Sequence, residues 1–116
     1  MSWRSSRRAN VDSVTANGEV WWAEVPNDKI RPVVVLTRSR VANRLHAVVV
    51  APITSTARGL ATEVVMGSAE GVREGSVANL DNTMLLHRSA LGRKCGQVDA
   101  ARWPEFCLAV HKMMGC

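Results

Sequence analysis

Three apolar runs specify the first half of this chain: EVWWAEV at residues 19–25, RPVVVLT at residues 31–37 and LHAVVVAPI at residues 45–53. The first run alternates between two faces, whereas the other two are rich in β-branched residues, and both patterns are typical of strands. Pro32 cannot donate a ladder hydrogen bond, so we place it at the start of its strand, and we expect Pro52 to end or bulge the third strand. The sequence therefore predicts a series of buried strands from residue 19 onward.

The second half of the chain predicts shorter strands and a final helix. We expect strands at residues 61–66, 76–80 and 94–98, a Gly-rich turn region at 67–75 and one helical turn at 87–91. Asp99 is a suitable N-cap and Pro104 suits a first helical turn, so the helix should begin at Pro104 after a tight turn. One face of this helix is apolar and comprises Trp103, Phe106, Cys107, Val110 and Met113 or Met114, which we expect in the core.

The order of these elements predicts the fold class. Five or six short strands followed by one C-terminal helix are typical of a mainly β protein, in which a small, strongly twisted antiparallel sheet or partial barrel packs against the helix. Neighbouring residues of a strand point to opposite faces, so only one of Trp21 and Trp22 can face the core. We expect the other one to contact the helix or a second subunit, and stacking on a nucleic-acid base is the alternative.

Length and composition indicate one ordered domain behind a basic arm. The chain has 116 residues, of which 47% are hydrophobic, and this suits a single globular domain. Residues 1–17 are polar and basic, and we interpret them as a flexible arm ahead of the domain at residues 18–116. Arg4, Arg7 and Arg8 could contact a phosphate backbone, although a solvated tail is the simpler interpretation.

Nothing in the sequence indicates secretion, membrane insertion or a metal centre. The basic N-terminal residues are not followed by an apolar run, and no stretch approaches the roughly 20 apolar residues of a membrane span. The cysteines, Cys95, Cys107 and Cys116, form no CxxC pair and no zinc-ligand cluster with histidine. We therefore expect a cytoplasmic protein without metal or cofactor, with Cys107 in the core and Cys116 free.

The charge of the chain suggests a polyanionic partner. Fifteen Lys and Arg against ten Asp and Glu give a net charge of +5, which would attract RNA, although charge for solubility explains it equally well. Several basic residues lie in loops beside the expected strands, where they could line a groove that follows a phosphate backbone or form a scattered surface: Lys29, Arg38, Arg40, Arg44 and Arg58.

Several segments, taken in order, resemble the MazF/PemK toxin family. They are GEVWWAEV at 18–25, RPVVVL at 31–36, VAPITS at 50–55, SVANLD at 76–81, and LGR and GQV at 91–93 and 96–98. The resemblance covers residues 18–115. It implies an SH3-like small barrel of the PemK/CcdB toxin type, a homodimer, sequence-preferring cleavage of single-stranded RNA, and a cognate antitoxin whose C-terminal segment lies across the active groove.

Two departures from the family pattern concern the groove. The loop before the Arg-Pro pair is short, spanning only residues 26–30, where many members have a longer Gly-rich loop with an acidic or Ser residue. Met84 stands where many members have an Arg. The base preference of other members therefore does not carry over to this chain.

Two residues suit the chemistry that the resemblance implies. RNA carries its own nucleophile, because a 2′-OH can attack the adjacent phosphorus, expel the 5′-oxygen and leave a 2′,3′-cyclic phosphate without a metal. Such an enzyme must stabilise charge on the phosphoryl oxygens, and the planar fork of Arg31 suits that task, as the family's Arg would. Thr54 matches the family's Thr or Ser at the strand end and could donate its hydroxyl. The ordinary alternatives are a charged residue at a strand start and a turn Thr that bonds its own backbone.

Further candidates concern substrate contacts and proton transfer. We expect Ser55 and Asn82 to support RNA binding, together with Lys29 and Arg58. Asp28 could replace the missing loop acid. Three histidines have a suitable pKa for a general base, and among them His87, in a loop, could reach the groove, whereas His46 and His111 are more consistent with structural or solvent-facing positions.

Two rival functions remain at this stage. One is a toxin of the same fold that traps DNA gyrase, as CcdB does, and the other is an inactive RNA-binding barrel. The joint presence of Arg31 at the start of one strand and Thr54 at the end of another resembles the nucleases and favours RNA cleavage.

Overall fold

The computed structural model describes residues 16–26, 29–42 and 44–116. Nearly all of the expected basic arm, and the candidate Asp28, therefore lie outside the described residues. The strands are β1 (Glu19–Glu24), β2 (Ile30–Val35), β3 (Ala47–Thr54), β4 (Glu63–Met66), β5 (Ser76–Asn79), β6 (Met84–His87) and β7 (Leu91–Gln97). The helices are α2 (Ser39–Ala42) and α3 (Trp103–Met114), and the short 3-10 turns are η2 (Ser68–Glu70), η3 (Leu80–Asn82), η4 (Arg88–Ala90) and η5 (Ala100–Arg102).

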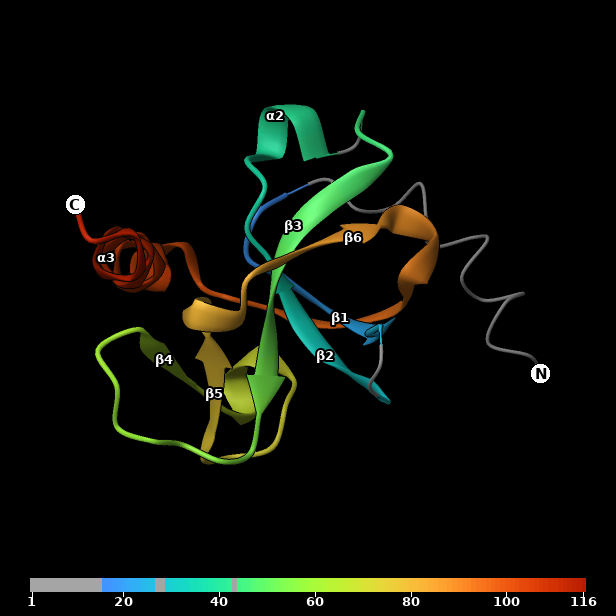
Figure 1. Cartoon of the computed structure of the whole chain (residues 1–116). Coiled ribbons are helices and arrows are strands. Elements are labelled where there is room, and N and C mark those ends of the chain that lie inside the picture. The colour runs from blue at the N-terminus through green and yellow to red at the C-terminus, as the bar shows by residue number, and fades with distance from the viewer. Residues whose placement is uncertain (1–15, 27–28, 43) are drawn as a thin grey trace.

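All strand pairs are antiparallel, and β3 is the strand on which the sheet branches. The sheet runs in the order β4-β5-β3-β2-β1-β7, and β6 pairs with β3 outside this path. On one side β3 pairs with β2. On its other side, residues 47–50 pair with β6, whereas Ile53 and Thr54 pair with β5. Figure 1 shows β3 crossing the middle of the molecule, with β6 beside its first half and β5 beside its end.

Pro52 lies where β3 changes partner. The Leu36 amide donates to the Val49 carbonyl with an N–O distance of 2.8 Å, and the polar groups of an antiparallel strand alternate between its two sides. The main-chain groups of Val49 and Ala51 therefore face β2, and those of Pro52 face the gap between β6 and β5. A proline fits there because it has no N–H that needs a partner. Our expectation that Pro52 ends or bulges the strand is wrong, since β3 continues to Thr54.

The sheet buries one apolar cluster on each side of β1 and β2. The first cluster lies between β1, β2, β3, β6 and β7 and contains Trp21, Ala23, Val33, Val35, Val48, Val50, Leu86 and Leu91. The second cluster lies under α3 and contains Val20, Val34, Ala51, Ile53, Val64, Met66, Ala78, Leu80, Val98, Phe106 and Ala109. The alternation of β1 explains this division, since Val20 faces the second cluster and Trp21 and Ala23 face the first.

The final helix begins at Trp103, one residue before the predicted Pro104. The Asp99 carboxylate accepts a hydrogen bond from the Ala101 amide at 2.9 Å and caps η5, after which Pro104 stands in the first turn of α3. Phe106 is fully buried, and Trp103 stacks on it with a centroid distance of 5.0 Å. This turn and the burial of Phe106 seat α3 on the second cluster.

Two expectations about this helix are wrong. Cys107 is exposed, because it lies about 100° around the helix from Phe106 and so at the margin of the buried stripe. Met114 is also exposed, at the C-terminal end of α3. Within the described ranges, no helix is long and apolar enough to cross a membrane.

The mainly antiparallel sheet with a C-terminal helix confirms the predicted fold class, whereas the predicted strand count was too low. The described part of the chain has seven strands. The sequence reading missed β6, and β7 is longer than expected and begins at Leu91 rather than Lys94.

Candidate functional site

Arg31 and Thr54 come together because β2 and β3 are antiparallel neighbours. In the register of this strand pair, Val33 lies opposite Pro52, and two residues further along Arg31 lies level with Thr54. Arg31 stands near the start of β2 and Thr54 at the end of β3, so both side chains lie at the same end of the strand pair. Both are half-buried, which allows each to be held by the sheet and still reach a ligand.

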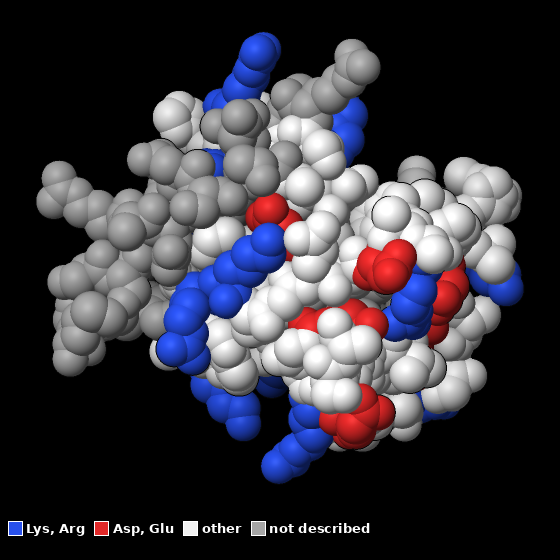
Figure 2. Space-filling model, turned by 180° about the vertical axis from the view of Figure 1, so that it is seen from behind, with Lys and Arg blue, Asp and Glu red and all other residues white. Residues whose placement is uncertain are grey.

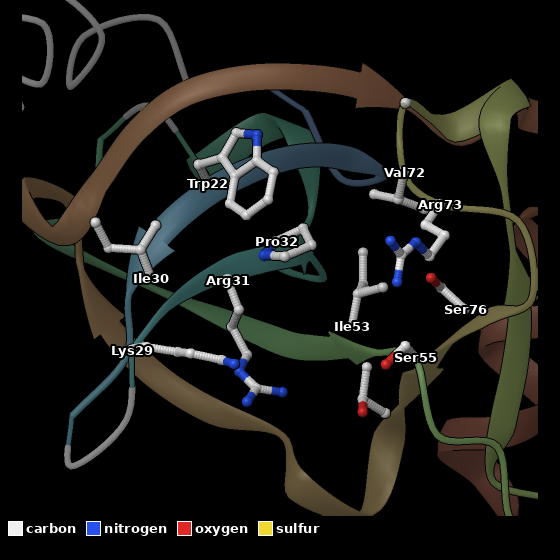
Figure 3. Close-up of a pocket in the computed structure, with 12 residues that line it drawn as sticks. Trp22, Lys29, Ile30, Arg31, Pro32, Ile53, Ser55, Val72, Arg73 and Ser76 are labelled. Atoms are coloured by element: carbon white, nitrogen blue, oxygen red, sulfur yellow. The ribbon is translucent and has the colours of Figure 1, made fainter.

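The first of two pockets beside this pair is lined by both apolar and basic residues, and we call it the Trp22 pocket. Its volume is about 590 Å³. Apolar lining comes from Trp22, Ile30, Pro32, Ile53 and Val72, and the other lining residues are Lys29, Arg31, Thr54, Ser55, Gly71, Arg73 and Ser76. In Figure 3, the Trp22 indole lies on one side of this pocket, Arg73 and Ser76 lie on another, and the Arg31 side chain extends between Lys29 and Ser55.

The second pocket is smaller and polar, and we call it the Asn82 pocket. Its volume is about 190 Å³, and it is lined by Arg31, Pro52, Thr54, Thr56, Arg58, Asn79 and Asn82. Arg31 and Thr54 line both pockets, so the two pockets meet at this pair. We refer to the joined pockets as the groove.

The groove is electropositive. Lys29, Arg31 and Arg73 line the Trp22 pocket, and Arg58 lines the Asn82 pocket, whereas neither set of described lining residues includes Asp or Glu. Cations gathered in a concave site attract polyanions and fit phosphate oxygens. Figure 2 shows the molecule from behind, where basic and acidic side chains lie beside one another on the surface.

The hydroxyl of Thr54 has one local partner. Its Oγ1 accepts a hydrogen bond from the Thr56 amide at 3.3 Å, which is the turn contact that the ordinary interpretation of this residue predicts. A hydroxyl that accepts in this way still has its own proton to donate. The local bond therefore orients Thr54 without using its donor.

The polar wall of the Asn82 pocket is also oriented by local bonds. The Asn79 Oδ1 accepts from the Asp81 amide at 3.1 Å, so its amide nitrogen is the group left to donate. The Glu63 carboxylate accepts from the amides of Arg58 and Leu60 at 3.0 and 3.2 Å and holds the loop that carries Arg58. These contacts fix donors around a space that suits an anion or a polar base edge.

Most of the residues expected from the sequence line this groove. Arg31, Thr54, Lys29, Ser55, Arg58 and Asn82 all do, whereas Asp28 lies outside the described residues. Of the other candidates that the structure describes, Arg38, Arg44 and the histidines do not line the groove.

His87 does not lie near Thr54. It pairs with Ala47 at the opposite end of β3, which is about 23 Å from Thr54 at roughly 3.3 Å per strand residue. There it stacks with His46 at a centroid distance of 6.4 Å. Our interpretation of His87 as a group that reaches the groove is therefore wrong.

The sequence analysis missed Arg73, Ser76, Thr56 and Asn79 as groove residues, and offered base stacking for the outward-facing one of Trp21 and Trp22 only as an alternative. The signal for Trp22 was present, because alternation turns it away from buried Trp21. Arg73 gave no signal, since it lies in a Gly-rich turn region that only tertiary packing brings to the groove. No group of three or more His, Cys, Asp or Glu suited to a metal ion occurs within residues 16–26, 29–42 and 44–116.

Comparison with known proteins assigns the chain to a family. Residues 16–114 match the model of the PemK-like, MazF-like toxin of type II toxin–antitoxin systems. The chain is 41% identical over 100 residues to the probable endoribonuclease MazF2 of Mycobacterium tuberculosis, which covers 85% of this chain and 97% of that protein. It is 45% identical over 83 residues to the endoribonuclease MazF3 of the same species, which covers 72% of this chain and 81% of the relative.

Solved structures agree with this assignment. The M. tuberculosis toxin MazF-mt6 superposes with a TM-score of 0.79 at 39% identity, covering 84% of this chain and 96% of that one. A mycobacterial endoribonuclease solved in complex with its cognate antitoxin superposes with a TM-score of 0.76 at 25% identity, covering 86% and 94%. The chain therefore belongs to the PemK-like, MazF-like toxins of type II toxin–antitoxin systems, the family of the MazF endoribonucleases.

Proposed function

We propose that this chain cleaves single-stranded RNA without a metal ion, by attack of a 2′-OH on the adjacent phosphorus, and that a cognate antitoxin neutralises it. The reaction forms a bond from the 2′-oxygen to phosphorus and breaks the bond to the 5′-oxygen, which leaves a 2′,3′-cyclic phosphate and a 5′-OH. The single observation that carries the proposal is that Arg31 and Thr54 line both pockets of one basic groove. The named MazF relatives support this function over a CcdB-like gyrase poison.

Arg31 is the proposed phosphoryl-binding residue. Its guanidinium can donate two parallel hydrogen bonds to the non-bridging oxygens, on which charge develops as the 2′-oxygen attacks. The rigid backbone of β2 keeps the guanidinium in place before the substrate arrives, so little reorganisation is needed at the moment of reaction. Thr54 donates its free hydroxyl proton to the same phosphoryl group from the neighbouring strand.

Asp28 is the proposed acceptor of the 2′-OH proton, from its sequence position directly before Lys29, which lines the Trp22 pocket. A carboxylate is a suitable general base for this step. Replacement by Asn keeps the size of the side chain and removes its basicity. A pH–rate profile of Asp28→Asn that matches the wild type at every pH would exclude this role.

We also propose that the toxin acts as a homodimer in the cytoplasm, where its RNA substrate and its antitoxin would meet it. An apolar pocket of about 840 Å³ between α3 and the sheet, lined by Leu36, Val49, Trp103, Phe106 and Val110 among others, supports a second subunit. Sedimentation of the purified chain across a concentration series measures the oligomeric state, and a monomer at all concentrations would contradict the dimer.

The test of the proposed function is cleavage of a single-stranded RNA in excess EDTA. We expect the wild type to cut, the products to carry a cyclic phosphate, and Arg31→Ala and Thr54→Val each to lower the rate by about 10²–10³-fold, which is typical for loss of one transition-state donor. Arg44→Ala is the matched control, because Arg44 is exposed before β3, at the end of that strand remote from Thr54. Cleavage that requires a divalent ion, or an Arg31→Ala variant as active as Arg44→Ala, would overturn the proposal.

A further inference from the structure

Trp22 carries an aromatic ring that neither apolar cluster uses. Its neighbour Trp21 is buried in the first cluster, whereas Trp22 is half-buried and lies in the pocket named after it. Figure 3 shows the Trp22 indole beside Pro32, with its ring toward the pocket. An aromatic face next to a phosphate-binding centre is a surface on which an unpaired base can stack.

Arg73 supplies a cation to the same pocket from a different part of the chain. Among the described residues it has no ion-pair partner. The carboxylate of the next residue, Glu74, is engaged elsewhere: it accepts from the amide and the hydroxyl of Ser68 at 2.6 and 2.7 Å. These bonds lower the pKa of Glu74 and keep it turned toward Ser68. Arg73 is therefore available to an anion in the pocket.

Backbone packing against β7 fixes the segment that carries Arg73. Gly71 has a φ of +84°, and a Cβ built there would overlap the carbonyl oxygen of Cys95. A Cβ built on Gly96 would likewise overlap the carbonyl oxygen of Glu70. The two chain segments touch through their main chains, at a distance that only glycines permit. The backbone that carries Arg73, two residues after Gly71, is therefore held rigidly against β7.

Side-chain bonds hold the same segment from the other side. The buried Glu70 carboxylate accepts from the Gly67 amide at 2.7 Å and pairs with Arg102 at 3.1 Å. Arg102 also bonds the Glu105 carboxylate at 2.8 Å and the Val65 carbonyl at 2.6 Å. Preorganisation of this kind lowers the entropy lost when a ligand binds.

We propose that Trp22 and Arg73 form a nucleotide subsite beside the cleavage centre, in which the base of a nucleotide adjacent to the cut stacks on the indole and Arg73 pairs with the phosphate beyond that nucleotide. The inference rests on the proposed RNA cleavage at Arg31 and Thr54 and adds the residues that hold the substrate next to them. Stacking accepts any base, so this subsite contributes affinity and register along the strand.

The first experiment measures binding of a non-cleavable probe, a single-stranded RNA with a 2′-deoxy nucleotide at the cut. The cleavage motif that the probe carries is identified first, by sequencing the 5′ ends of RNA cut by the wild type. We expect Trp22→Ala to weaken binding by about 5- to 150-fold, the range for loss of one base stack, and Trp22→Phe to retain most of the affinity. Arg73→Ala should make the negative slope of log K against log salt shallower by about 0.7, the value for one phosphate contact with a single strand. Binding by Trp22→Ala within twofold of the wild type would overturn the subsite.

The second experiment removes a base from the RNA probe instead of removing the Trp22 indole from the protein. Probes with an abasic nucleotide on either side of the cut are titrated against wild type and Trp22→Ala. At one of the two positions, removal of the base should weaken binding to the wild type by the same factor as Trp22→Ala weakens binding of the intact probe. The same abasic probe should then bind Trp22→Ala nearly as well as the intact probe does. Additive losses at both positions would contradict the stack.

The outcome separates this inference from the proposed function. If the wild type does not cleave in EDTA, the same titrations with a short mixed-sequence RNA still test the subsite: a Trp22-dependent affinity supports it while the cleavage proposal fails. Sedimentation of Trp22→Ala supplies the structural control. A dimer that dissociates on this substitution would assign the ring to a subunit contact and overturn the subsite.

Discussion

Gly71 and Gly75 belong to one loop, share one backbone conformation and differ in the space beside them. Their φ values are +84° and +83°. A Cβ on Gly75 would meet nothing within 4 Å, whereas a Cβ on Gly71 would overlap the main chain of Cys95. Alanine at either position carries the left-handed backbone penalty of about 1–2 kcal/mol. Gly71→Ala adds a steric clash with rigid backbone, for which overpacking values of about 1–3 kcal/mol are the guide.

The comparison of the two alanine variants therefore isolates the contact between the loop and β7. We expect Gly75→Ala to lower the free energy of unfolding by about 1–2 kcal/mol and Gly71→Ala by about 2–5 kcal/mol. Urea unfolding followed by circular dichroism measures both, at one protein concentration because association changes apparent stability. Equal losses, within about 0.5 kcal/mol, would refute the close packing of this loop on β7.

The remaining predictions concern the helix, one carboxylate and the guanidinium of Arg31, which we propose to be catalytic. Phe106→Ala should lower the free energy of unfolding by about 3–5 kcal/mol in the same urea assay, because this side chain of α3 is fully buried in the second cluster. Asp99→Ala should lower it by about 0.5–2 kcal/mol through loss of the cap; no change would mean that the cap is dispensable. The pKa of Glu74 is lowered from its ordinary value of 4.5 by hydrogen bonds from Ser68, so the stability it contributes is present above that value and is lost as the pH falls below it. The unfolding free energy of Glu74→Gln should therefore fall less steeply with acid than that of the wild type. Arg31→Lys keeps the charge but not the planar fork, so its cleavage rate should remain well below the wild-type rate; full activity would show that charge alone suffices.

The core strands could be predicted from local sequence because their apolar runs are long. Residues 19–25, 31–37 and 45–53 each overlap an observed strand, and the ends differ by at most two residues. β6 was missed because it has only four residues, directly after η3. The start of β7 was missed because Leu91-Gly92-Arg93 carries a glycine and has no alternation, and its pairing with β1 makes it a strand.

The centre of the site could be predicted from the sequence, whereas its periphery could not. Arg31 and Thr54 stand at ends of strands that local patterns locate, and antiparallel pairing brings such ends together. Arg73 and Ser76 reach the groove only because the loop before β5 rests on β7, and this is a contact between residues far apart in sequence. Alternation correctly separates Trp21 from Trp22, but it does not say what the outward ring faces.

Pro52 lies at the point where β3 changes its partner from β6 to β5, and it also lines the Asn82 pocket. Any other amino acid there would bring a main-chain N–H into the wall of that pocket, and a substrate oxygen would bind it whatever the neighbouring side chains were. With proline, the donors around this part of the groove belong to side chains such as Arg58 and Asn82. If the proposed function holds, exchange of those side chains would change which RNA sequence is accepted, while the strand beneath them stays as it is.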